Sequence, residues 1–161
     1  MNMSSVTVDS IGLAKEINES GKYNSVRNKL VEMSRLPEGN RGSSTAPLSG
    51  KKLGAAPEWA IGSVHAVTEN GKVIIVSATG SQLPAYAYGS GHVIWVVGSQ
   101  KIVKDIEEGF KRVEEYVLPL ENERAMKAYG RGSGVNKELV VNKEVQPGRI
   151  TMIIVKEKLG F

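Results

Sequence analysis

Apolar residues recur along the chain with two spacings, which predict strands in some stretches and helices in others. Continuous apolar or β-branched runs predict strands at about residues 5–8, 60–68, 72–77, 92–97, 138–144 and 150–155. Spacings of three and four predict helices at about residues 11–20, 25–36, 81–88, 101–117 and 121–129. Ser99 stands where the N-cap of the 101–117 helix is expected.

The order of these elements indicates an α/β fold. The runs at 92–97 and 150–155 are nearly all apolar, which is typical of strands buried on both faces, as in a parallel sheet. Asn70 and Gly71 separate two strand-like runs and predict a tight hairpin, because both residue types tolerate positive φ. We therefore expect a mixed, mostly parallel sheet covered by helices on both faces.

The 161 residues correspond to one domain, 1–161. The clear alternation of elements occupies residues 58–161, whereas residues 1–57 have the character of a divergent or incomplete front part. From about 38 to 57 the chain is rich in Gly, Ser, Pro and basic residues, so we expect a long loop there.

Composition excludes several classes of function. The chain has no cysteine, which excludes disulfides and cysteine-held zinc or iron–sulfur clusters, and its two histidines leave little for a metal site, so we expect no metal or other cofactor. It has no apolar run of the roughly 18 residues that a membrane helix needs and no signal peptide, so we expect a cytoplasmic protein. The net charge of +4 is evenly spread and not interleaved with aromatics, which argues against nucleic-acid binding.

Two turns could carry chemistry. Thr79, Gly80 and Ser81 follow a strand and precede a helix, where hydroxyls and backbone N–H groups can hold an anion. Glu69 stands beside the predicted hairpin turn, where it could act as a general base or a covalent nucleophile, with Thr68, Asn70 and Gly71 around it. An ordinary capped turn and a solvated glutamate are the favoured interpretations of the two.

Three basic residues are further candidates for a functional role. Arg149 follows Pro147-Gly148 just before a buried strand and could pair with a bound carboxylate or phosphate, although a surface turn residue is the default. His65 and His92 are interpreted as packed or surface residues, because no second ligand stands at metal-site spacing. We expect the hairpin glutamate and the glycine turn to meet at the carboxyl edge of the sheet, with Arg149 nearby.

Several short motifs, taken in this order, resemble the LUD domain, the lactate-utilisation protein family. The resemblance runs from about residue 58 to 161. Its markers are Ala66-Val-Thr-Glu-Asn-Gly71, Thr79-Gly80 with the following Ala-rich helix, the Val93–Val97 strand, Gln100-Lys-Ile-Val103, and Pro147-Gly-Arg-Ile150 through Leu159-Gly-Phe161. Near the front, Ser5-Val-Thr7 and Ile11-Gly-Leu13 are similar to the family's Ser-x-Thr and Ile-Gly-Leu region.

The resemblance implies a fold similar to the NagB, RpiA and CoA-transferase group. It also implies an accessory, non-redox role linked to oxidation of L-lactate to pyruvate, with binding of a small carboxylate or phosphorylated ligand. Iron–sulfur chemistry would belong to partner proteins, since the cysteine-rich insert that some relatives carry is absent at 129–136. The chain is also compatible with a homo-oligomer.

Two alternatives stay open. Thr68-Glu-Asn-Gly71 looks like the Ser-Glu-Asn-Gly motif of CoA transferases, whose glutamate forms a glutamyl thioester. On that interpretation Glu69 would attack an acyl-CoA, although the companion oxyanion loop is not recognisable. Because the chain starts almost at the Ser-x-Thr position, where many relatives carry a longer front part, a truncated, non-catalytic interaction module is the other alternative.

Overall fold

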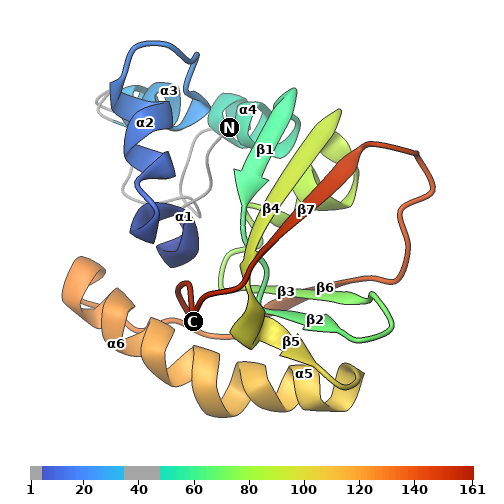
Figure 1. Ribbon diagram of the computed structural model, residues 1–161. Coiled ribbons are helices and arrows are strands. Elements are labelled where there is room, and N and C mark those ends of the chain that lie inside the picture. The colour runs from blue at the N-terminus through green and yellow to red at the C-terminus, as the bar shows by residue number, and fades with distance from the viewer. Residues whose placement is uncertain (1–4, 35–47) are drawn as a thin grey trace.

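The computed structural model describes residues 5–34 and 48–161, whose strands form two sheets that run in different directions (Figure 1). The first sheet has the order β1 (Trp59–Gly62), β4 (His92–Gly98), β7 (Ile150–Val155). The second has the order β5 (Ile102–Val103), β2 (Ala66–Thr68), β3 (Val73–Ser77), β6 (Lys137–Val141). The α/β class is confirmed, and most pairings are parallel: β1–β4, β4–β7 and β2–β5, against antiparallel β2–β3 and β3–β6. The strands divide over two sheets where one was expected.

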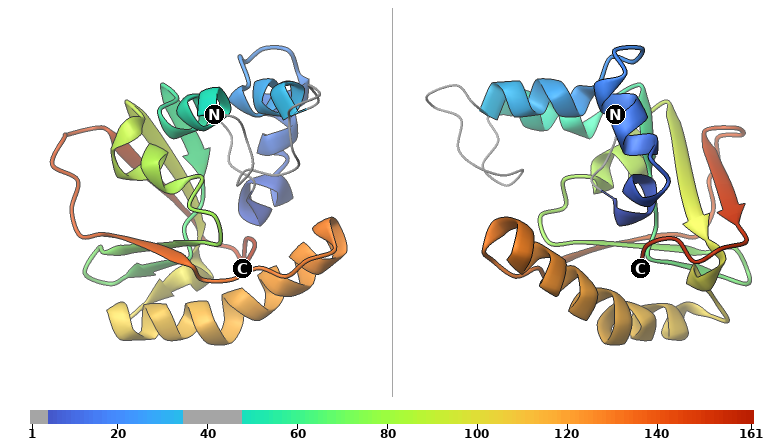
Figure 2. Two further views of the ribbon diagram at one scale, coloured as in Figure 1. Left: turned by 180° about the vertical axis from the view of Figure 1, so that it is seen from behind. Right: turned by 60° about the vertical axis from the view of Figure 1, so that its left-hand side comes forward.

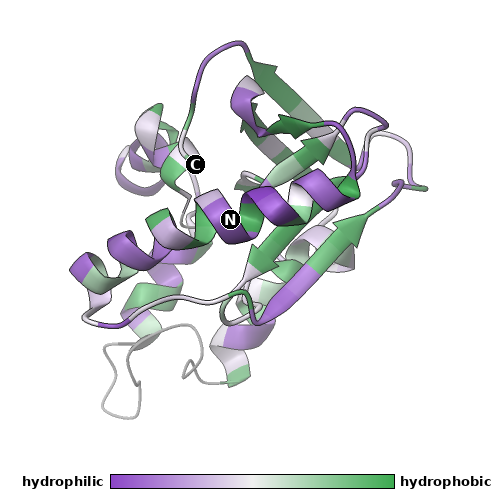
Figure 3. Ribbon diagram, turned by 90° about the horizontal axis from the view of Figure 1, so that it is seen from below, coloured by the Kyte–Doolittle hydropathy of each residue, from purple (hydrophilic) through white to green (hydrophobic). Residues whose placement is uncertain are grey.

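The helical segments pack around these sheets. They are α1 (Val6–Ser10), α2 (Leu13–Glu19), α3 (Val26–Ser34), α4 (Leu48–Ala55), the π-helical turn η1 (Ala85–Gly89), the 3-10 turn η2 (Ser99–Lys101), α5 (Ile106–Arg112), the π-helical turn η3 (Val113–Val117) and α6 (Leu118–Tyr129). Figure 2 shows α5, η3 and α6 as one long rod along the second sheet, with α1 to α3 beside the first sheet. In Figure 3 that rod mixes hydrophilic and hydrophobic residues, as a helix with one buried face does.

One core cluster joins the first sheet to residues of β2 and β3, and a second lies between the second sheet and the α5–η3 helix. In the first sheet β4 is the central strand and is paired in parallel on both sides. Trp95 of β4 is 1% exposed and meets Tyr86 of η1 edge to face, with 5.6 Å between ring centroids. Edge-to-face packing of two large rings adds to the free energy gained by burying them. The buried parallel strand predicted at 92–97 is confirmed.

The stretch predicted as one strand over 60–68 is divided between the two sheets. β1 ends at Gly62 and β2 begins at Ala66. In the linker between them, the Val64 carbonyl accepts from Lys101 Nζ and the His65 carbonyl accepts from Arg112 Nε. Side chains therefore take the carbonyls that a continuous strand would give to a ladder, and the chain crosses from one sheet to the other.

Two predictions for the front of the chain were wrong. The strand expected at 5–8 is part of α1, because the Ser5 hydroxyl accepts from the backbone N–H of Val8 and caps a helix. The loop expected at 38–57 contains α4, in which Gly50 and Gly54 are buried. These glycines suggested a loop, but here they belong to a helix. The rest of that expected loop up to 47 lies outside the described residues.

Two later predictions also need correction. Ser99 does not cap the long helix, because Ile102 and Val103 pair with β2 and the helix begins after Asp105, whose carboxylate accepts from the Glu108 N–H. β7 is not buried on both faces. It is an edge strand that pairs with β4 alone, and Ile153 and Ile154 are 47% and 50% exposed.

Candidate functional site

The Thr68–Gly71 hairpin is held by its own polar groups. The Thr68 hydroxyl donates to Asn70 Oδ1 at 2.6 Å and accepts from the Lys72 N–H at 2.8 Å. Gly71 adopts a φ of 85°, and its N–H donates to the Thr68 carbonyl. The Glu69 N–H donates to the Val103 carbonyl of β5, and the Glu69 side chain is exposed. The predicted hairpin is confirmed, and these contacts are those of a capped turn.

The turn at Thr79–Ser81 is also filled by protein groups. The Gly80 N–H donates to the Ser77 hydroxyl at 2.8 Å, and the Ser81 N–H donates to the Thr79 hydroxyl at 3.4 Å. Lys137 crosses the turn: its Nζ donates to the Thr79 carbonyl at 2.8 Å, and its side chain occupies the space beside Gly80. The N–H groups of Gly80 and Ser81, which could have bound an anion, therefore donate to hydroxyl groups of the turn itself.

These two turns lie at opposite ends of β3. The hairpin precedes Val73, and the glycine turn follows Ser77. Because β2 and β3 are antiparallel, the short loop that joins them stays at one end while β3 carries the chain away from it. The expectation that Glu69 and Thr79 meet in one cleft was wrong for this reason.

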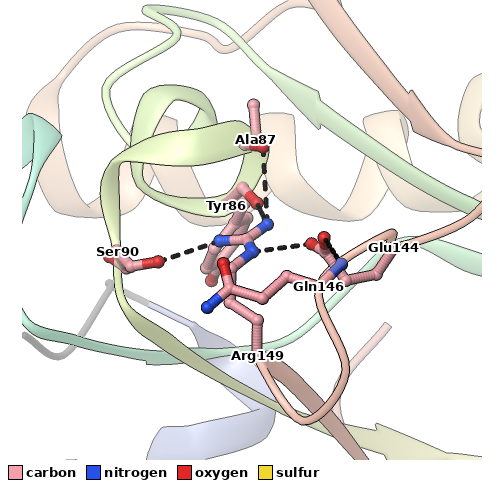
Figure 4. A network of polar contacts seen from close by, with 6 residues as sticks. All are labelled: Tyr86, Ala87, Ser90, Glu144, Gln146 and Arg149. Carbon is pink, nitrogen blue, oxygen red and sulfur yellow. Dashed lines mark hydrogen bonds and ion pairs between the residues drawn. The ribbon is translucent and has the colours of Figure 1, made fainter.

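Arg149 is buried, and its guanidinium donates to four protein acceptors (Figure 4). Its Nε donates to Glu144 Oε2 at 2.6 Å, its Nη1 to the Ser90 carbonyl at 3.0 Å, and its Nη2 to the carbonyls of Tyr86 at 2.8 Å and Ala87 at 3.4 Å. The backbone N–H of Gln146 and the Arg149 guanidinium lower the pKa of the Glu144 carboxyl. Arg149 thus ties the start of β7 to η1 and to the loop before β7.

A cleft of about 500 Å³ lies over this network, and we call it the Arg149 cleft. It is lined by η1, the turn after it and the segment between β6 and β7; among its residues are Tyr88, Gly89, Ser90, Gly91, Lys143 and Arg149. Lys143 and Tyr88 are exposed, while the Ser90 hydroxyl is buried and has no hydrogen-bond partner in the described part of the chain. Of the residues predicted for a site, Arg149 lines this cleft, and Glu69 and Thr79 do not.

The two histidines have different surroundings. The imidazole of His65 accepts from the Val76 N–H through Nδ1 at 3.1 Å. Burial, with smaller contributions from the nearby charges of Lys101 and Arg112, lowers its pKa to about 3. His92 is exposed and stacks on Trp59, with 4.2 Å between ring centroids. Within residues 5–34 and 48–161, no three His, Cys, Asp or Glu side chains group as a metal site would require.

Sequence reasoning missed a buried lysine. Lys101 is 2% exposed, and its Nζ donates to the Thr7 hydroxyl at 2.9 Å, the Ser63 hydroxyl at 3.1 Å and the Val64 carbonyl at 3.1 Å. Burial, and next the charge of Arg112, lowers the pKa of Lys101 to about 8. One local signal pointed here, since Lys101 comes shortly after the carboxyl end of the central strand.

Comparisons with known proteins place the chain in a family. The model of the LUD domain matches residues 51–155. None of the curated proteins that were compared matches the chain. The crystal structure of a DUF162 family protein from Deinococcus radiodurans is similar over 60% of this chain and 52% of that chain, with 17% identity and a TM-score of 0.38. The present chain thus spans about half the length of that protein.

No helix in the described parts of the chain has the length and apolar character to cross a membrane. The family model covers well over half of the residues, and the chain therefore belongs to the LUD-domain family, which is linked to lactate utilisation.

Proposed function

We propose that this protein is an accessory, non-redox component of L-lactate oxidation to pyruvate that binds a small carboxylate ligand in the Arg149 cleft. Membership of the LUD-domain family supports the link to lactate. The observation that carries the ligand is the cleft itself, in which the exposed side chain of Lys143 stands beside the Arg149–Glu144 ion pair.

The charges in the cleft suit a monoanion. Arg149 and Glu144 neutralise each other and hold the wall in place. Lys143 is exposed on the same lining and supplies an ammonium group for a carboxylate. The Ser90 hydroxyl, which has no hydrogen-bond partner among the described residues, would gain an acceptor if it turned towards the bound ligand. A volume of about 500 Å³ falls in the usual range for small-molecule clefts.

Electron transfer is assigned to partners. The 161 residues contain no cysteine, so a cysteine-held iron–sulfur cluster would have to be bound outside them. We propose that iron–sulfur lactate-utilisation proteins are those partners. Co-purification with such proteins from cells grown on lactate, and its absence from cells grown on glucose, is the outcome expected of this partnership.

Ligand binding is tested by titrating the ¹⁵N-labelled protein with L-lactate and with pyruvate at constant ionic strength. Saturable amide shifts are expected in Gly89–Gly91 and in residues 143–149. Lys143→Ala should weaken binding by about tenfold, the loss expected for one charge-assisted contact. Lys15→Ala, which removes an exposed lysine of α2, is the matched control and should leave binding unchanged. No shift with either acid, or equal affinity in both variants, would rule out this ligand assignment.

A further inference from the structure

The carboxyl ends of the three parallel strands meet at one place in the molecule. β1 runs into Ser63, β4 runs into η2 with Lys101, and the segment after β7 packs on the backbone of Gly98. In open α/β sheets, ligands bind beyond the carboxyl ends of the strands. The Arg149 cleft lies at the other end of this sheet, where β4 and β7 begin. The carboxyl edge is therefore a separate place to look for a ligand.

That edge holds the ammonium group of Lys101, which has no counterion among residues 5–34 and 48–161. Lys101 Nζ donates to two hydroxyls and one carbonyl. In the described parts of the chain, no carboxylate oxygen lies within 4.0 Å of it. A buried charge is costly unless it is paired with an opposite charge, and neutral dipoles compensate only part of that cost.

A second cation stands across the same linker. Arg112 donates through Nε to the His65 carbonyl, while its Nη2 is buried and has no hydrogen-bond acceptor among the residues that the structure describes. No carboxylate of the described residues forms an ion pair with Arg112 either. Two basic side chains thus flank residues 63–65, and neither is paired with a carboxylate of the described residues. The charge of Arg112 adds to the effect of burial and lowers the pKa of Lys101.

A short helix covers Lys101. α1 has five residues and meets the rest of the protein through its buried residues Thr7 and Val8. The Thr7 hydroxyl accepts from Lys101 and donates to the Leu159 carbonyl at 3.2 Å. Figures 1 and 2 show α1 lying beside this last segment of the chain. A helix of this length is marginal on its own, so its place in the fold depends on the contacts of Thr7 and Val8, and it can open locally without global unfolding.

We propose that Lys101 and Ser63 form a binding site for a small oxyanion, a carboxylate or inorganic phosphate, and that α1 closes this site when it is empty. The anion takes the place of the Thr7 hydroxyl on Lys101 Nζ, accepts from Ser63, and supplies the missing negative charge. Binding and the docking of α1 are therefore mutually exclusive. This site is independent of the Arg149 cleft and of the function proposed for it.

The test is a titration of the ¹⁵N-labelled wild-type protein with sodium phosphate, and separately with sodium L-lactate, against sodium chloride at equal ionic strength. Saturable shifts are expected in residues 63–65 and 99–102 for at least one oxyanion, together with faster hydrogen exchange in residues 6–10 as α1 is displaced. Which salt acts distinguishes a phosphate from a carboxylate site. Shifts confined to the Arg149 cleft, or none that exceed those with chloride, would overturn the proposal.

Variants separate a ligand role from a structural one. Lys101→Met should weaken oxyanion binding at this edge by at least about tenfold, whereas Lys104→Met, at an exposed position three residues on, should not change it. Thr7→Val removes the competing hydroxyl and should tighten binding severalfold while α1 exchanges faster. If Lys101→Met does not fold, the Thr7→Val result still decides: unchanged or weaker binding in that variant contradicts competition by α1. Lys143→Ala should leave this edge unaffected.

Discussion

The two ends of the three-stranded sheet each bury a basic side chain, but they treat it differently. At the amino end, Arg149 has a carboxylate and three carbonyls as acceptors. At the carboxyl end, Lys101 has two hydroxyls and one carbonyl as acceptors, and no carboxylate among residues 5–34 and 48–161. At the amino end, the acceptors of Arg149 hold the surrounding backbone in place. At the carboxyl end, burial and the charge of Arg112 lower the pKa of Lys101. A change of pH or an added anion should therefore act at the carboxyl end.

The largest effect is expected from Arg149→Met. Removing one partner of a buried ion pair typically costs about 3–5 kcal/mol of unfolding free energy, and here three carbonyls lose their donor as well. Urea denaturation followed by tryptophan fluorescence measures the loss, since Trp95 lies in the same core. Arg149→Lys keeps the charge but not the planar set of donors, so its unfolding free energy should lie between those of wild type and Arg149→Met. A loss under about 1 kcal/mol would mean that Arg149 does not hold this end together.

Acid should destabilise the protein through His65. The pKa of His65 is about 3 in the folded chain, against 6.5 for the free side chain. Between these values the unfolded state binds a proton that the folded state does not, so stability falls as the pH falls from about 6.5 towards 3, by up to about 1.4 kcal/mol per pH unit. Urea midpoints at pH 7, 5.5 and 4.5 measure this.

The comparison variant is His65→Asn, whose side-chain oxygen can still accept from the Val76 N–H. Its stability should depend less on pH over the same range. Parallel pH curves for the two proteins would show that His65 does not carry the effect.

Alkaline pH should stabilise the carboxyl end. Folding lowers the pKa of Lys101 from 10.5 to about 8, so between these values the unfolded chain binds more protons and stability rises with pH. Burial raises the pKa of Tyr86, which makes stability fall once the unfolded tyrosine ionises near pH 10. The window from pH 8 to 9.5 therefore isolates Lys101. A rise of about 1–2 kcal/mol is expected in wild type and not in Lys101→Met; equal slopes in both proteins would remove Lys101 as the cause.

The contrast between the two ends also shows what the sequence could predict. Local patterns sufficed for the Asn70-Gly71 hairpin and for the buried strand at 92–97, because neighbouring residues decide both. Burial of Lys101 depends on Thr7, 94 residues away, and no periodicity in the chain expresses that contact. The prediction that Glu69 and Thr79 lie together was wrong for a similar reason, because the direction of a strand within a sheet depends on long-range contacts. The default interpretation of Arg149 as a surface turn residue was wrong, because the fold buries it and supplies its acceptors from Glu144 and from backbone carbonyls of residues 86–90.

The smallest effect is expected at the hairpin, and it tests the acyl-transfer alternative. Glu69 is exposed and its backbone N–H is paired with Val103, so Glu69→Gln should change unfolding free energy by less than about 0.5 kcal/mol. A glutamate nucleophile also needs donors for the oxyanion that forms on attack, and the hairpin's Thr68 and Gly71 donors are spent within the turn. Incubation of wild type with acetyl-CoA should therefore give no covalent adduct by intact mass. An adduct that forms on wild type and is lost in Glu69→Gln would instead make Glu69 the nucleophile and place the chemistry on the second sheet.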